Sequence, residues 1–166
     1  QMGESVSIFE KKISKYCGKK YGLMVNSGSS ALILAIESLN LKKGSEIIVP
    51  GLNFGTAVSS VLICDNKPVI VDEEIENHQL NITKIEKKIT KKKKKIMIAH
   101  ALGHCAEMDK LTRICKQNKI RLVKNADETL ASTVKHKLLV TYGELYSFSF
   151  YSSSPIRSEN GVWVSV

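Results

Sequence analysis

Apolar residues follow two alternating patterns along the chain. Short apolar runs of strand length, such as EIIVPG at 46–51 and IMIAHALG at 96–103, alternate with segments such as 107–119, where apolar residues recur every three or four positions. This alternation is typical of a mostly parallel sheet covered by helices. The pattern therefore predicts an α/β fold with three layers, in the order α/β/α, and a mostly parallel central sheet.

The same patterns give the expected bounds of each element. Helices are predicted at 5–21, 29–41, 56–66, 81–89 and 107–119. Strands are predicted at 21–28, 46–51, 68–74, 96–103, 120–127, 144–151 and 162–166. Two residues support these bounds, because Pro68 suits the start of a strand and Asn81 suits the N-cap of a helix.

Length and composition agree with a single domain over residues 1–166. The chain has 166 residues, of which 43% are hydrophobic, and this is enough for one substantial core. No apolar run is long enough for a membrane span, and the first residues lack the order of a signal peptide. We therefore expect a cytoplasmic protein that does not have a membrane as partner.

Cysteines and charge exclude some classes of site. The four cysteines lie at wide, unequal spacings without a CxxC pair, so we expect reduced thiols and no zinc site. Much of the net charge of +9 comes from the lysines in EKKITKKKKKIMIAH, at 86–100. We interpret this run as a solvated helix end and loop, with a polyanion-binding surface as the alternative. Because no aromatic residues interleave with the lysines, nucleic acid is not an expected partner.

The first candidate for chemistry is NSGSSAL, at 26–32. A strand that ends in this turn and opens directly into a helix gathers unpaired backbone N–H groups and the positive end of the helix dipole. Gly28 lets the backbone approach a ligand closely, and Ser29 and Ser30 offer hydroxyl groups. The stretch suits a phosphate group, although an ordinary serine N-cap fits the same residues.

Three further stretches follow predicted strands, where ligands bind in open α/β sheets. In PGLNFGTA, at 50–57, Asn53 and Phe54 lie where a planar ring could stack, with a core phenylalanine as the alternative for Phe54. In HALGHCAEMD, at 100–109, the two histidines lack the helical spacing and partners of a metal site, so no metal is expected. In VKNADETLAS, at 123–132, Asn125 and Glu128 are close enough in sequence to face one ligand.

In their order and spacing, these stretches resemble the large-domain half of the nucleotide-sugar aminotransferases of the DegT/DnrJ/StrS type. The resemblance includes FEKKISKYCGKKYGLMVNSGSSAL, KKGSEIIVPGLNFGTAVSSV, KPVIVDEE and the SFSFY strand, and it runs from about residue 5 to the chain end. These relatives are pyridoxal-phosphate proteins with the aspartate-aminotransferase fold, fold type I. The stretch MIAHALGH is most similar to the sugar 3-dehydratase branch, which uses pyridoxamine phosphate and a histidine where aminotransferases have the Schiff-base lysine.

The resemblance implies a cofactor, a substrate class and a set of ligands. The cofactor is pyridoxal 5'-phosphate or pyridoxamine 5'-phosphate, and the partner is a nucleotide-linked 4-keto sugar of surface polysaccharide biosynthesis, including lipopolysaccharide. Gly28 and Ser29 correspond to the phosphate cradle, Ser149 to a further phosphate ligand, and Phe54 to the residue stacked on the pyridine ring. Members of the family act as homodimers, and they continue with about as much chain again, including a small C-terminal domain. We therefore expect an incomplete large domain that lacks the small one.

Two matched positions depart from the family at the residues that do its chemistry. Asn125 lies where the family has the aspartate that pairs with the pyridine nitrogen, and an amide has no charge to give. Ser154 lies at the lysine or histidine position, and a serine hydroxyl neither forms a Schiff base nor acts unaided as a base. Glu128 matches a position that contacts the ring substituents. The residues thus indicate a sugar aminotransferase or dehydratase impaired when alone, with a non-catalytic binding or assembly module as the alternative.

Overall fold

The computed structural model describes residues 3–76, 80–89, 93–99, 107–125, 133–134, 136–138, 141–149 and 162–165. Within these residues, helices and strands alternate as the hydrophobic pattern predicts. The helices are α1 (Glu4–Tyr16), α2 (Gly28–Glu37), α3 (Gly55–Ile63), α4 (Ile82–Lys88) and α5 (Met108–Gln117). The strands are β1 (Gly22–Val25), β2 (Glu46–Pro50), β3 (Lys67–Val71), β4 (Lys93–Ala99), β5 (Arg121–Asn125), β6 (Thr133–Val134), β7 (Lys137–Leu138), β8 (Leu145–Ser149) and β9 (Val162–Ser165).

Seven strands form one sheet in the order β1-β9-β8-β5-β4-β2-β3. The pairs β2–β3, β2–β4, β4–β5 and β5–β8 are parallel, and β9 is antiparallel to both of its neighbours, β1 and β8. The prediction of a mostly parallel sheet is confirmed. Since parallel strands end at the same edge, the carboxyl ends of β2, β5 and β8 lie at one edge of the sheet.

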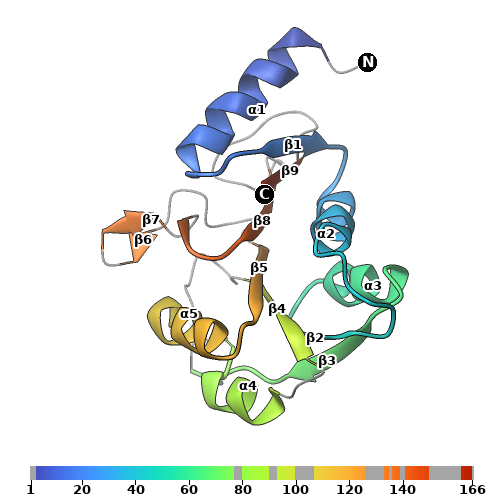
Figure 1. Ribbon diagram of the computed structural model, residues 1–166, viewed down its shortest axis with the longest axis vertical. Coiled ribbons are helices and arrows are strands. Elements are labelled where there is room, and N and C mark those ends of the chain that lie inside the picture. The colour runs from blue at the N-terminus through green and yellow to red at the C-terminus, as the bar shows by residue number, and fades with distance from the viewer. Residues whose placement is uncertain are drawn as a thin grey trace.

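Helices cover both faces of this sheet (Figure 1). On one face, α2 and α3 pack against Ile47 and Val49 of β2, Val123 of β5 and Leu145 of β8. On the other face, α4 and α5 pack against strand residues with the opposite orientation, among them Leu122. These are the three layers that the pattern predicts, and the α2/α3 face is the one relevant to the site.

The lysine run differs from its expected structure. We predicted that strand β4 begins at the apolar residue 96, after a solvated loop, but β4 begins at Lys93. Lys93 pairs with Glu46 of β2, and Lys95 pairs with Arg121 of β5. The physical reason is that β4 lies between two neighbours, and hydrogen bonding on both sides outweighs the weak strand propensity of lysine. The lysines of α4 do end a helix, as expected.

The described cysteines, Cys17, Cys64 and Cys115, are free thiols, as predicted. Cys115 lies on the buried face of α5 with Met108, Leu111 and Ile114, which also agrees with the helical spacing. The fourth cysteine, Cys105, lies outside the described residues. Among the helices that the structure describes, none combines the length and apolar character needed to cross a membrane.

Candidate functional site

The turn before α2 is held by a serine cap. The Ser27 hydroxyl accepts a hydrogen bond from the Ser30 backbone N–H at 3.2 Å and lies 3.0 Å from the Ser30 hydroxyl, which donates to Asn26 Oδ1 at 2.8 Å. Ser27 and Ser30 are therefore engaged within the turn, and the N-cap alternative holds for Ser27. Gly28 and Ser29 begin the helix, where backbone N–H groups have no intrahelical acceptor and the dipole favours an anion.

Phe54 lies at the start of α3, in the loop that follows β2. Its side chain is 76% exposed, so the alternative of a core phenylalanine is wrong. The ring is exposed because Phe54 is the N-cap of α3, and the helix turns its apolar face inward only from Ala57 onward. An exposed aromatic ring at this edge of the sheet is available for stacking on a planar ligand.

Hydrogen bonds fix the loop that carries Phe54. The Glu73 carboxylate accepts from the Leu52 backbone N–H at 2.6 Å, and Asn53 Oδ1 accepts from the Phe54 N–H at 2.8 Å. The Gly51 N–H donates to the Val71 carbonyl at 2.9 Å, which ties the loop to strand β3. Asn53 Nδ2 is buried and has no hydrogen-bond partner in the described part of the chain. A buried donor without a partner favours a ligand acceptor at this loop.

Asn125 ends strand β5 and pairs in register with Ser147 of β8. The Ser147 hydroxyl donates to Asn125 Oδ1 at 3.0 Å, and both residues are buried, with exposed fractions of 6% for Asn125 and 0% for Ser147. Because alternate residues of a strand share a face, Asn125 lies on the same face as Val123, beneath α2. The amide is thereby held in one orientation at the carboxyl edge of the sheet.

Lys124 lies on the opposite face of the sheet, as its position next to Asn125 predicts. Its side chain is fully buried, and its ammonium group lies 4.2 Å from the centroid of the Tyr146 ring and 5.8 Å from that of Tyr142. Burial raises the pKa of Tyr146, so this ring remains a neutral phenol at physiological pH. Lys124 therefore belongs to the packing below α1 and does not provide an amine at the Asn125 face.

The structure gathers several predicted site residues on one edge and one face. Gly28 and Ser29 open α2, Phe54 opens α3, and Asn125 ends the strand over which α2 packs. Ser149 is the last residue of β8, at the same edge as Asn125. Glu128 and Ser154 lie outside the described residues, as do His100 and His104.

Sequence reasoning missed one polar residue of this edge, Ser147. The signal for Ser147 was available, because residues two apart in a strand share a face and Ser147 precedes the candidate Ser149 by two positions. The position of Asn53 after strand β2 follows from the sequence, but its buried amide does not, since that depends on the loop formed with Glu73.

Comparison with known proteins shows the family. The model of the DegT/DnrJ/EryC1/StrS aminotransferase family matches residues 1–164. The chain belongs to this family. The family predicted from the sequence is thus confirmed.

Curated relatives in the DegT/DnrJ/EryC1/StrS family include two kinds of enzyme at the same identity. The chain is 31% identical over 160 residues to GDP-perosamine synthase of Caulobacter vibrioides, covering 96% of the chain and 43% of the relative. It is also 31% identical over 166 residues to GDP-4-keto-6-deoxy-D-mannose 3-dehydratase of Yersinia pseudotuberculosis, covering 96% of the chain and 42% of the relative. The chain therefore spans less than half the length of these relatives.

Solved structures of the family share the fold. The 3-dehydratase for GDP-4-keto-6-deoxy-D-mannose from E. coli, solved with bound hydrated pyridoxal phosphate, is 30% identical and superposes with a TM-score of 0.93. That match covers 100% of the chain and 44% of the dehydratase chain. The aminotransferase PseC of Helicobacter pylori, at 22% identity and a TM-score of 0.92, shows the same fold. The predicted fold class, that of the large domain of these enzymes, is confirmed.

Proposed function

We propose that this chain binds pyridoxal 5'-phosphate or pyridoxamine 5'-phosphate without a covalent bond and serves the metabolism of nucleotide-linked 4-keto sugars. The observation that carries the proposal is the gathering of the α2 start, the exposed Phe54 ring and Asn125 on one edge and one face of the sheet. Relatives that act on GDP-linked sugars share the family and the fold. We also propose that the chain forms a homodimer and acts in the cytoplasm.

The described residues fit such a cofactor. Gly28 and Ser29 offer a phosphate the free N–H groups and the dipole of α2, and Ser29 adds a hydroxyl group. Phe54 offers an exposed face to the pyridine ring, and the Asn53 amide next to it, which has no partner among the described residues, offers a donor. Ser149, at the end of β8, is proposed as a further phosphate ligand, and Glu128 as a contact to the ring substituents.

The cofactor, when bound, supplies an aromatic ring that withdraws electrons from a substrate carbon. The two residues that match the catalytic positions of the family, Asn125 and Ser154, are neutral. The Asn125 amide, which is held by the Ser147 hydroxyl, can form a hydrogen bond with the ring nitrogen. Because the amide has no negative charge, it does not stabilise the protonated form of that nitrogen as a carboxylate would. Ser154 cannot provide the amine of a lysine or the base of a histidine. We therefore propose that the chain alone binds the cofactor and catalyses transamination or dehydration poorly.

A titration with pyridoxamine 5'-phosphate tests the proposal, because this form has no aldehyde and does not label surface lysines. We expect saturable binding, and the variant Phe54→Ala should weaken it by roughly threefold to tenfold, the usual effect of a lost aromatic stack. Ile75→Ala is the matched control, since Ile75 is also exposed, at 91%, and lies outside the site. Absence of binding, or equal loss in both variants, would refute cofactor binding.

Covalent trapping separates the binding role from catalysis. After incubation with pyridoxal 5'-phosphate and borohydride, mass spectrometry should find no label at position 154 in the parent chain, because serine forms no Schiff base. The variant Ser154→Lys should gain a label at that residue. Turnover of a nucleotide-linked 4-keto sugar by the parent chain alone would contradict the impaired catalysis. Binding without turnover would support it and leave the binding or assembly module as its biological role.

A further inference from the structure

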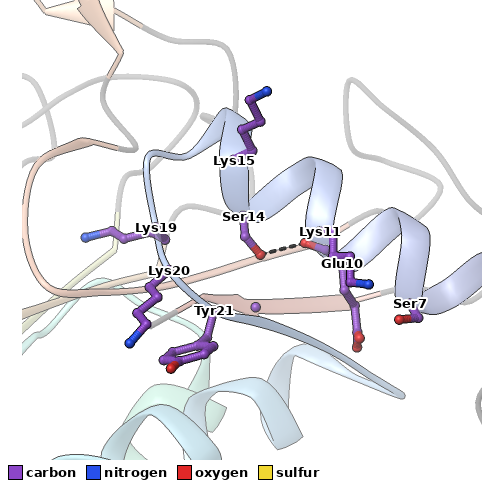
Figure 2. A pocket seen from close by; sticks show the side chains of 9 residues that line it. Ser7, Glu10, Lys11, Ser14, Lys15, Lys19, Lys20 and Tyr21 are labelled. Carbon is purple, nitrogen blue, oxygen red and sulfur yellow. Dashed lines mark hydrogen bonds between the residues drawn. The ribbon is translucent and has the colours of Figure 1, made fainter.

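A polar pocket away from the candidate site lies between α1 and the segment that leads into β1. Its volume is about 360 Å³, and its walls carry Lys11, Lys15, Lys19 and Lys20 together with Tyr21. Figure 2 shows these side chains with α1 on one side and the Tyr21 segment on the other. Gly22 is the first residue of β1 and Tyr21 precedes it, whereas Gly28 lies after the end of the strand. The pocket therefore lies at the opposite end of β1 from the proposed cofactor site.

The charge of this pocket is strongly positive. Its lining includes four lysines and a single acidic residue, Glu10, whose carboxylate accepts a hydrogen bond from the Met24 backbone N–H at 2.8 Å. Glu10 is thus fixed to strand β1. Neither Lys11 nor Lys20 has an ion-pair partner in the part of the chain that the structure describes. Their ammonium groups remain available to an anion.

One lysine of the pocket has a structural role. The Lys19 ammonium donates to the Gly143 carbonyl at 2.7 Å and lies 4.9 Å from the centroid of the Tyr146 ring. Partial burial lowers the pKa of Lys19. Lys19 therefore joins the pocket to Gly143 and to Tyr146 of β8, and the exposed Lys11 and Lys20 are the cations available for binding.

Tyr21 gives the pocket an aromatic wall. Its side chain is 61% exposed, and the Lys20 ammonium lies 4.9 Å from the ring centroid. In Figure 2, the Lys20 ammonium lies beside the Tyr21 ring, and Lys11 extends from α1. An exposed ring in a pocket lined by lysines combines the two contacts that a nucleotide uses, stacking for its base and charge pairing for its phosphates.

We propose that this pocket binds a nucleoside diphosphate, with the phosphates at Lys11 and Lys20 and the base against Tyr21. The volume lies within the range of small-molecule sites, at the lower end of about 300 to 1,000 Å³. A phosphate group alone would use the lysines and leave the aromatic wall without a role. The site is separate from the cofactor edge, so it does not depend on the function proposed above.

Calorimetric titration of the whole chain with adenosine diphosphate tests this proposal. The double variant K11Q/K20Q should weaken binding by about tenfold or more, because two charge-assisted contacts are lost. The control K12Q/K42Q removes the same charge from exposed lysines outside the pocket and should leave affinity within about twofold. Tyr21→Ala should weaken binding by roughly threefold to tenfold, and Tyr16→Ala, at another exposed tyrosine, should not.

Two competing ligands complete the test. Pyrophosphate should bind more weakly than adenosine diphosphate and should be insensitive to Tyr21→Ala, whereas equal affinity of the two would overturn the nucleoside assignment. Pyridoxamine 5'-phosphate at saturation should not displace the nucleotide, and displacement would assign nucleotide binding to the cofactor edge instead. Equal losses in K11Q/K20Q and K12Q/K42Q, or no binding, would overturn the proposal. Loss of pyridoxamine phosphate binding alone would refute only the function proposed above.

Discussion

Asn125 shows how one side chain changes the chemistry that an edge of the sheet supports. Its amide is 6% exposed and accepts the Ser147 hydroxyl at 3.0 Å, so it is held in a neutral hydrogen-bonded pair. A carboxylate at the same place would carry a charge in a buried setting, which costs free energy unless a cation pairs with it. The residue therefore favours stability of the free chain over stabilisation of a charged ring nitrogen.

The variant Asn125→Asp tests this balance. We expect it to lower the free energy of unfolding of the ligand-free chain by about 1 to 3 kcal/mol, because a buried carboxylate replaces an amide. It should also tighten pyridoxamine phosphate binding, because the carboxylate pairs with the protonated ring nitrogen. Urea unfolding and a binding titration measure the two effects.

Asn40→Asp is the control, because Asn40 is exposed and has a φ of 47°. It should change neither the free energy of unfolding nor the binding. A more stable variant that binds pyridoxamine phosphate less tightly would contradict this account of Asn125.

Among the elements, the start of α2 combines a structural and a binding role in adjacent residues. Ser27 caps the helix by accepting a hydrogen bond from the Ser30 N–H, while the backbone N–H groups of Gly28 and Ser29, in the first turn, have no intrahelical acceptor. Ser27→Ala should lower the free energy of unfolding by about 1 kcal/mol, the usual cost of a lost N-cap. Ser27→Asp should keep most of the stability, since aspartate also caps, but its charge should repel the cofactor phosphate. Thermal unfolding and pyridoxamine phosphate titration separate the two roles. Equal effects of both variants on binding would mean that the phosphate does not lie there.

The elements also show what periodicity predicts and what it leaves out. The spacing of Met108, Leu111, Ile114 and Cys115 predicts the buried face of α5 correctly. For α1, the spacing of Ile8, Phe9, Ile13 and Tyr16 predicts one apolar face, but Ile8 and Tyr16 are 47% and 45% exposed. The buried side of α1 is decided by the cluster of Cys17 and Tyr146, against which Phe9 and Ile13 of the helix pack. Apolar spacing alone could not predict it, because the partner residues come from a distant strand.

In the site too, features formed within a short stretch of sequence were predicted, whereas features that join distant residues were not. The start of α2 follows from a short stretch of sequence, and the helix begins at Gly28. That residue 125 is neutral is read directly from the sequence. The sequence does not predict the hairpin of β6 and β7, because two-residue strands are too short to show a periodic pattern. It also does not predict the hydrogen bond from the Leu52 N–H to Glu73, because these residues lie far apart in the sequence.

In the whole molecule, strand β9 joins segments from both ends of the chain. It pairs antiparallel with β1 on one side and β8 on the other, and so completes the part of the sheet beneath α1 (Figure 1). Cys17 lies in the cluster that joins α1 to Tyr146 of β8, and Cys115 lies in the separate cluster of α4 and α5. These two thiols therefore report on different parts of the molecule.

If the two parts unfold together, Cys17 and Cys115 should become reactive in a single transition. Burial raises the pKa of both thiols to about 11, and the side chains are 0% and 5% exposed, so neither should react with a thiol reagent at pH 8 without opening. Labelling in increasing urea, resolved by mass spectrometry of each cysteine, should give the same dependence for both. Cys64 provides the contrast, because it is only half-buried and should react earlier, faster as the pH rises toward its raised pKa of about 11. Labelling of Cys17 well before Cys115 would instead mean that α1 and the strands beneath it open as a separate unit, and the sheet edge joined by β9 would then be the weak point of the fold.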